Sequence, residues 1–210
     1  MVGSILYASS KNAIVWGAGI ISRYQNIKKP KSVLAVRGPL TRARFLELGY
    51  ECPEIYGDPA LLLPRFYKPK SDKKYELGII PHYIDYSFVQ RKIENVNNNV
   101  LVINLFYPVE KVIDEICSCK RIISSSLHGV ITSHAYEIPS IWVKFSNKLA
   151  GDDSKFIDYF LSVKLSSEYI PLDFSKTIPD YKEICELVDK IFCKPNINVE
   201  KLLEVCPFKG

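Results

Sequence analysis

Three consecutive serines followed by a histidine and a glycine form the segment of this chain best suited to chemistry. Ser124, Ser125 and Ser126 precede Leu127, His128 and Gly129, between a β-branched run and an apolar stretch that predicts a helix over residues 127–136. Hydroxyls and free backbone amides at the positive end of a helix favour an anion. A histidine there can transfer protons, because its ordinary pKa is about 6.5. The alternative is that a serine caps the helix and His128 packs against the sheet.

Other polar residues occupy the same kind of position, directly after a predicted strand, where open parallel sheets bind their ligands. Arg37 leaves the strand at 32–36, and its guanidinium can hold a phosphate or carboxylate in a bidentate fork or form a salt bridge. His82 follows the strand at 75–80, and Phe106-Tyr107 follow the next one. Asp58 is predicted to cap a helix that begins at the following proline.

Gly17-Ala18-Gly19, after the first predicted strand, is a weaker signal. It resembles the start of a dinucleotide-binding loop, in which Gly17 would approach a ligand. However, the third glycine and the acidic residue about 20 positions on are absent. Glycines that allow a tight turn are the favoured interpretation. Cys117 and Cys119 have no second Cys or His pair at metal-ligand spacing, so we expect no metal site. We expect the six cysteines to be reduced and mostly buried thiols. We also expect His134, inside a predicted helix, to be structural.

The elements that must position these residues alternate between short β-branched strands and helices, which is typical of βαβ units and a parallel sheet. The sequence predicts α/β architecture with two Rossmann-like lobes and a charged linker at 65–74. The N-terminal lobe, residues 1–68, contains only three predicted strands and looks incomplete. The C-terminal lobe spans 69–165, and residues 166–210 form a helical tail that packs on the lobes. The predicted strands are 12–16, 32–36, 54–57, 75–80, 100–105, 121–124 and 140–143, and the predicted helices are 40–48, 86–95, 109–117, 127–136, 155–161, 180–192 and 199–205.

Charge is concentrated at the N-terminal end of the chain. Of the 210 residues 28 are Lys or Arg and 23 are Asp or Glu, and the first 46 residues contain eight basic and no acidic side chains. Such a segment favours an anionic partner: nucleic acid, anionic lipid or a phosphorylated substrate. No aromatic residues alternate with Lys28, Lys29 and Lys31, so we expect a solvated loop and no nucleic acid. Without a signal peptide or a long apolar run, the sequence predicts a cytoplasmic protein.

Five segments in order resemble the polysaccharide pyruvyl transferase family: residues 36–43, 57–64, 78–83, 123–131 and 155–160. The resemblance implies a glycosyltransferase-B-like fold, in which two lobes face a cleft. It also implies transfer of pyruvate, as a ketal, from phosphoenolpyruvate to a sugar of a surface polysaccharide or its precursor. The acceptor saccharide can be lipid-linked, which would bring the protein to the inner face of the membrane as a peripheral partner.

The resemblance also implies roles for individual residues. Arg37 and the Leu127-His128-Gly129 element match positions associated with phosphoenolpyruvate in the family, where many members have an arginine in place of Ser126. We therefore predict that His128 and Arg37 are catalytic, with His128 as proton donor to the enol carbon or base toward the sugar hydroxyl. The predicted substrate-binding residues are Ser124, Ser125, Ser126, Leu127, Gly129, His82, Asp58 and Gly17.

Phosphoenolpyruvate is a co-substrate in this scheme, and no other cofactor is expected. Two alternatives remain open. A glycosyltransferase would use a nucleotide sugar in the same cleft, because a helix terminus binds its phosphates equally well. A sugar- or phosphate-binding protein without catalysis would use the same groups and show no turnover.

Overall fold

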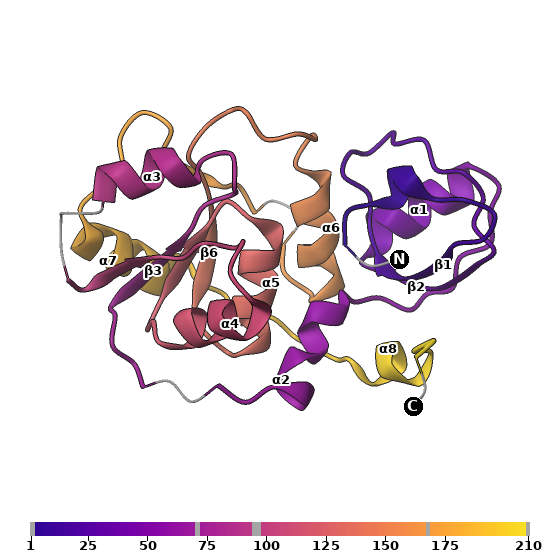
Figure 1. Ribbon diagram of the computed structural model, residues 1–210. Helices are drawn as coiled ribbons and strands as arrows, with labels where there is room; N and C mark the ends of the chain where they lie inside the picture. The colour runs from indigo at the N-terminus through magenta and orange to yellow at the C-terminus, as the bar shows by residue number, and fades with distance from the viewer. Residues whose placement is uncertain (1–2, 70–71, 94–97, 167–168, 209–210) are drawn as a thin grey trace. The chain divides into compact units, whose positions relative to one another are not determined.

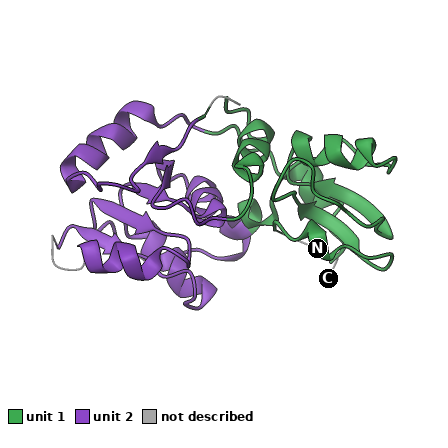
Figure 2. Ribbon diagram, turned by 90° about the horizontal axis from the view of Figure 1, so that it is seen from above, with its two compact units in different colours: residues 1–62, 150–169, 195–210 green, residues 63–149, 170–194 purple. Residues whose placement is uncertain are grey.

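The computed structural model describes residues 3–69, 72–93, 98–166 and 169–208. The chain divides into two compact units (Figure 2). Unit 1 comprises Met1–Leu62, Ala150–Tyr169 and Pro195–Gly210. Unit 2 comprises Leu63–Leu149 and Ile170–Lys194.

Unit 2 is built on a five-stranded sheet in the order β4-β3-β5-β6-β7, and every pair of neighbouring strands is parallel. The central strands are short apolar runs, which suits strands that are covered on both faces. All residues of β3 and β5 are buried. The bounds are β3 Leu77–Ile80, β4 Val100–Val102, β5 Ile122–Ser124, β6 Ser140–Lys144 and β7 Leu172–Asp173.

Helices cover both faces of this sheet (Figure 1). On one face α3 and α7 pack through Val89, Ile184 and Val188 on the side chains of β3, β5 and β6. On the other face lie α4, which turns Ile113 and Ile116 inward, and α5. The bounds are α2 Leu63–Phe66, α3 Tyr86–Ile93, α4 Val109–Cys117, α5 Leu127–Ala135 and α7 Tyr181–Ile191.

The strand order creates a point at which the winding of the chain reverses. From β3 the chain passes through α3 to the neighbour β4, whereas from β5 it passes through α5 to β6 on the other side. The loops after β3 and β5 therefore leave toward opposite faces of the sheet. In doubly wound sheets the crevice at such a switch point is the usual ligand site. Ile80 and Ser124 are paired there at the carboxyl ends of the two strands.

Unit 1 contains a smaller parallel sheet, in which β1 pairs with β2 and Tyr56 adds a single bridge to Val36. One core gathers around Leu6, Val15 and Phe45. The indole Nε1 of Trp16 donates a hydrogen bond of 2.8 Å to the Leu202 carbonyl, which attaches α8 to the strand. The bounds are η1 Leu6–Ala8, β1 Ile14–Ala18, β2 Ser32–Val36, α1 Pro39–Glu47, η2 Pro59–Leu62, α6 Ser154–Ser162 and α8 Glu200–Glu204.

Most predicted elements of the alternating pattern are present, with ends shifted by a few residues. Within the described residues, the predicted strand at 54–57 is an isolated bridge between Tyr56 and Val36. Three short observed elements have no predicted counterpart: η1, α2 and β7. The helix predicted to extend to residue 95 is observed to Ile93, and residues 94 and 95 lie outside the described residues.

The predicted lobe boundaries need correction at three places. The first boundary follows Leu62, not residue 68, because the segment predicted as a linker packs on unit 2: Tyr67 Oη donates to Asp114 Oδ1 (3.0 Å), and Tyr136 Oη donates to the Tyr67 carbonyl (2.8 Å). Residues 150–165 were assigned to the C-terminal lobe, but α6 belongs to unit 1. The tail is divided, with α7 in unit 2 and α8 in unit 1.

None of the helices in the described ranges is long and apolar enough to cross a membrane.

Candidate functional site

The turn after β5 is held by the hydroxyl of Ser124. This side chain is fully buried, and its Oγ lies 2.9 Å from the carbonyls of Ile80 and Ser126 and accepts a hydrogen bond of 3.0 Å from the Ser126 amide. Ser126 then has extended backbone and is the N-cap of α5, although its side chain makes no capping hydrogen bond. The serine that shapes this turn is therefore Ser124, two residues before the cap position.

Gly129 allows α5 to approach the sheet closely. A Cβ at this position would lie 2.4 Å from Ser124 Oγ and 2.9 Å from Ile80 Cγ2. Both distances are shorter than real carbon contacts, so no residue with a side chain fits without displacement. The role of Gly129 is thus to bring the first turn of α5 against the ends of β3 and β5.

Ser125 connects this turn to the loop after β3. Its Oγ accepts a hydrogen bond of 2.9 Å from the backbone amide of His82, and its own amide donates to the Ile80 carbonyl (3.1 Å). The His82 ring lies next to that of Tyr83, with centroids 4.4 Å apart. The structure therefore brings His82 and the serine turn together at the switch point of unit 2.

His128 lies in the first turn of α5 with an exposed side chain, whereas Leu127 is buried. Packing against the sheet, the alternative left open by the sequence, is therefore wrong for His128. The histidine lines a cavity of about 290 Å³ together with Ser126, Thr132 and Tyr107. The rest of the lining is apolar and comes from Leu63, Leu105, Val109, Val112 and Ile113. An imidazole and three hydroxyls thus border a largely apolar cavity at the positive end of a helix.

Exposed aromatic rings are another feature of the carboxyl edge of this sheet. Tyr83, after β3, and Phe106, after β4, are exposed, and their centroids are 5.7 Å apart. Tyr107 is half-exposed, with Lys111 Nζ 3.6 Å from its ring centroid. Flat apolar ring faces in water at a ligand-binding edge are suited to stacking on a ligand.

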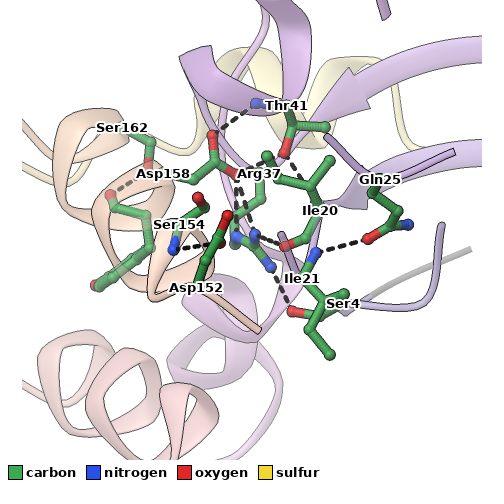
Figure 3. A network of polar contacts seen from close by, with 11 residues as sticks. Ser4, Ile20, Ile21, Gln25, Arg37, Thr41, Asp152, Ser154, Asp158 and Ser162 are labelled. Carbon is green, nitrogen blue, oxygen red and sulfur yellow. Dashed lines mark hydrogen bonds and ion pairs between the residues drawn. The ribbon is translucent and has the colours of Figure 1, made fainter. Parts of the chain in front are cut away.

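Arg37 has a different environment, at the centre of a buried network in unit 1 (Figure 3). Its guanidinium forms an ion pair of 3.1 Å with Asp158, and neither side chain has exposed surface. It also donates hydrogen bonds of 2.6 Å to Ser4 Oγ and to the Ile20 carbonyl. The second oxygen of Asp158 accepts from the Thr41 amide (2.9 Å). Of the two interpretations for Arg37, the salt bridge is the one present in this structure.

Two glycines, Gly19 and Gly38, leave the space that the ion pair of Arg37 and Asp158 occupies. A Cβ at Gly19 would lie 2.3 Å from Arg37 Cζ, and a Cβ at Gly38 would lie 1.9 Å from the Asp158 carbonyl oxygen. Lys155, in the first turn of α6, is also buried, and its pKa is lowered because burial disfavours the charged ammonium and Arg37 repels it. The network therefore joins the end of β1, the start of α1 and α6 within unit 1.

Gly17 and Asp58 also lie in unit 1 and have structural roles there. Gly17 lies inside β1, at a register shift between Trp16 and Ala18, and not in a tight turn after the strand as predicted. It has φ +73°, and a Cβ there would clash with Pro59 Cδ, so its lack of a side chain permits this irregularity and the close approach of Pro59. The oxygen Oδ1 of Asp58 accepts a hydrogen bond of 3.0 Å from the Ala60 amide, as predicted for a cap. The prediction that these two residues and Arg37 bind substrate stays a prediction.

His134 and the buried cysteines have environments typical of structural groups. His134 is buried in α5, and burial lowers its pKa to about 4, opposed by a hydrogen bond to the Ser140 backbone. Burial raises the pKa of the Cys52 and Cys117 thiols to about 11 and that of Cys119 to about 12. In the described part of the chain no three His, Cys, Asp or Glu side chains are grouped to hold a metal ion. The sequence analysis does not identify two residues that line cavities, Asp85 and Thr132. Asp85 lies in the loop after β3 and Thr132 lies inside α5, and neither belongs to a recognisable motif.

A doubly wound parallel sheet with a serine turn at its switch point, and with an exposed histidine and a cavity beside α5, gives unit 2 a Rossmann-like α/β fold. Folds of this kind commonly bind ligands at the carboxyl ends of their strands. The family model "Polysaccharide pyruvyl transferase" matches residues 3–147, which is more than half of the chain. The chain therefore belongs to the polysaccharide pyruvyl transferase family, as the sequence motifs indicated.

One relative is the Uncharacterized protein L143 of Acanthamoeba polyphaga mimivirus, which is 35% identical over 193 residues. The match covers 89% of this chain and 63% of that protein, so the chain spans less than two thirds of the length of this relative. No solved structure was found to match the chain.

Proposed function

We propose that this protein transfers pyruvate from phosphoenolpyruvate to two hydroxyls of a saccharide, forming a pyruvate ketal and releasing inorganic phosphate. The observation that carries the proposal is the position of His128. It is exposed on the first turn of α5, directly after the buried serine turn, at the switch point of unit 2. Family membership indicates the class of reaction.

The reaction defines what the site must supply. A proton adds to the methylene carbon of phosphoenolpyruvate, and a sugar hydroxyl oxygen forms a bond to C2. The bond between C2 and the bridging phosphate oxygen then breaks, and a second sugar hydroxyl closes the ketal. Of the two hydroxyl protons, one is accounted for by the new methyl group and the other by the released phosphate.

The groups on unit 2 match these needs. The backbone amides and the dipole at the N-terminus of α5 favour the carboxylate and phosphate. Charge that develops on the departing phosphate is stabilised by the same dipole. His128 would donate the proton to carbon and accept one from a sugar hydroxyl, a contribution of about 10²- to 10⁴-fold. The apolar lining of the cavity would exclude water from the enol.

The saccharide half of the proposal is supported by the exposed rings at the same edge. The faces of Tyr83 and Phe106 offer apolar surface to the C–H faces of a pyranose, while its hydroxyls remain accessible. The glycosyltransferase-B-like arrangement and the contact of Arg37, Asp58 and Gly17 with substrate also belong to this proposal. So do the lipid-linked acceptor and the location on the inner face of the membrane.

A turnover assay tests the proposal. The protein is incubated with phosphoenolpyruvate and a panel of saccharides, and ³¹P and ¹H spectra follow released phosphate and the ketal methyl signal. We expect turnover by the wild type and a loss of at least about 100-fold in His128→Ala and His128→Gln. Glu110→Gln, an exposed change on α4, is the control and should retain activity.

Nucleoside diphosphate sugars are tested in parallel under the same conditions. Transfer from a nucleotide sugar with phosphoenolpyruvate left intact would replace the proposal with a glycosyltransferase. Binding of phosphoenolpyruvate without any turnover over the panel would favour a binding protein. Full activity in His128→Ala, with unchanged circular dichroism, would remove the histidine from the mechanism.

A further inference from the structure

A second cavity, which unlike the first has a largely polar lining, lies at the carboxyl edge of the same sheet, between the residues that follow β3 and those that follow β6. Its volume is about 390 Å³. Its polar lining comes from Asp85, Ser146, Asn147 and Ser175, and its cationic lining from Arg91 and Lys148. The apolar side chains are Ile84, Phe88 and Phe145.

The carboxylate of Asp85 is the unusual feature of this cavity. The side chain is only 2% exposed. Its Oδ1 accepts a hydrogen bond of 2.6 Å from Ser146 Oγ, while its buried Oδ2 has no hydrogen-bond partner among the described residues. A buried carboxylate oxygen without a donor is costly, so at a cavity wall this oxygen is available to accept a hydrogen bond from a bound molecule. Ser146 is itself the donor to Oδ1, which leaves Oδ2 for the ligand.

We propose that this cavity binds a sugar phosphate, with a sugar hydroxyl donating to Asp85 Oδ2 and the phosphate lying at the cationic rim formed by Arg91 and Lys148. Each part of the ligand follows from one part of the lining. A hydroxyl is a neutral donor that a carboxylate accepts, two exposed cations favour an anion, and the ring of Phe88 offers apolar surface to a pyranose.

Other small anions fit less well. Inorganic phosphate and phosphoenolpyruvate satisfy the cationic rim, but near neutral pH they offer no sugar hydroxyl to the carboxylate, which repels their charge. A neutral sugar satisfies Asp85 and leaves the rim unused. A ligand that carries both a hydroxyl array and a phosphate uses all three features of the cavity.

The cavity is connected to the His128 site through one loop. The Asp85 amide donates to the His82 carbonyl (2.8 Å), and the His82 amide donates to Ser125 Oγ (2.9 Å). The loop over residues 81–85 thus links this cavity to the serine turn within unit 2. If the proposed function holds, the cavity is a subsite for a phosphorylated sugar of the acceptor, and this role rests on that function.

The test is a binding titration of the full chain without phosphoenolpyruvate, with glucose 1-phosphate as the probe, followed by ¹H–¹⁵N shifts. Glucose alone and inorganic phosphate alone form the two comparison arms. We expect shifts at residues 84–91 and 145–148, and affinity for glucose 1-phosphate higher than for either comparison ligand. Asp85→Asn keeps an acceptor for Ser146 and should weaken binding by about tenfold.

Matched variants separate the proposal from its alternatives. Asp72→Asn removes the same charge from an exposed position of unit 2, and His128→Ala alters the proposed catalytic site; both should bind glucose 1-phosphate like the wild type. Arg91→Gln, an exposed change that leaves the core intact, should weaken glucose 1-phosphate and phosphate but not glucose.

Equal affinity of Asp85→Asn and the wild type for glucose 1-phosphate would overturn the proposed subsite. It would also be overturned if the chemical shift changes were confined to the serine turn and were absent in His128→Ala. This titration measures binding and not turnover, so its result does not depend on whether the protein transfers pyruvate. Failure of the subsite proposal is therefore distinguishable from failure of the proposed function.

Discussion

The backbone amide of His82 and the hydroxyl of Ser125 form a hydrogen bond of 2.9 Å that joins the loop after β3 to the turn after β5. These are the two strand ends that flank the switch point. Ser125 is fully buried, so water does not replace its hydroxyl when the side chain is removed. This bond therefore helps to hold the loop after β3 against the turn that precedes α5, together with the hydrogen bond of the Ser125 amide to the Ile80 carbonyl.

We expect Ser125→Ala to cost about 1–3 kcal/mol of folding stability, because the His82 amide is left without its acceptor. Urea unfolding monitored by circular dichroism measures this cost. Ser87→Ala, an exposed change in α3, is the control and should have little effect. An unchanged urea midpoint for Ser125→Ala would show that the bond does not hold the loop.

Gly129→Ala should disturb the site through packing. The new methyl group meets Ser124 Oγ and Ile80, so overpacking is expected to cost about 1–3 kcal/mol and to weaken phosphoenolpyruvate binding together with stability. Gly49→Ala is the matched control: it strains a positive φ in unit 1 but meets no atom within 4 Å, and it should leave binding unchanged. Normal phosphoenolpyruvate affinity in folded Gly129→Ala would count against a binding role for the turn.

The ion pair of Arg37 and Asp158 should appear first as a stability effect. Removing either partner leaves the other charge buried, so Arg37→Ala and Asp158→Ala are each expected to lose about 3–5 kcal/mol. A double-mutant cycle in urea gives the coupling between them. Arg37→Lys keeps the charge and loses the fork, and calorimetric titration with phosphoenolpyruvate then tests the predicted substrate contact. A tenfold loss of affinity in folded Arg37→Lys would place Arg37 at the donor, and no loss would leave it structural.

We expect the free energy of unfolding to fall in acid because His134 is buried. Its pKa is lowered by burial to about 4, whereas in the unfolded chain it is about 6.5. The unfolded state therefore binds the proton more readily, so stability is lost as the pH falls from 6.5 toward 4. At pH 5 this loss is about 2 kcal/mol relative to pH 7.5. Urea midpoints of the wild type and His134→Gln at the two pH values measure it; a pH dependence that the variant retains in full would assign the effect to other groups.

The alternation of strands and helices in unit 2 was predictable because it depends on local signals. In α4 the apolar residues Val112, Ile113 and Ile116 recur at helical spacing, and the predicted bounds 109–117 are those observed. The serine turn followed from a polar run at the end of an apolar strand. What the sequence did not contain is the partner of each residue across the fold, such as the bond between Ser125 and His82, 43 positions apart.

Longer-range relations account for what the sequence analysis missed. Asp158 lies in the family-like segment 155–160 but 121 residues from Arg37, and nothing in the segment identifies it as the partner of Arg37. The salt bridge is therefore one of two interpretations that the sequence allows, and the sequence does not predict that the pair is buried. For the same reason α6 was assigned to the wrong unit, since a helix that follows four strands along the chain normally packs on their sheet. Asp85 shows no local pattern either, and its unsatisfied oxygen is visible only in three dimensions.

In the proposed function, the turn after β5 and the first turn of α5 bind phosphoenolpyruvate. The most direct measurement is a ¹H–¹⁵N titration of the isotopically labelled chain with phosphoenolpyruvate, with uridine diphosphate as a separate arm. We expect saturable shifts at the amides of Ser126, Leu127, His128 and Gly129 with phosphoenolpyruvate, and weaker or no shifts there with the nucleotide. Saturable phosphoenolpyruvate shifts elsewhere, with these four amides unmoved, would contradict it.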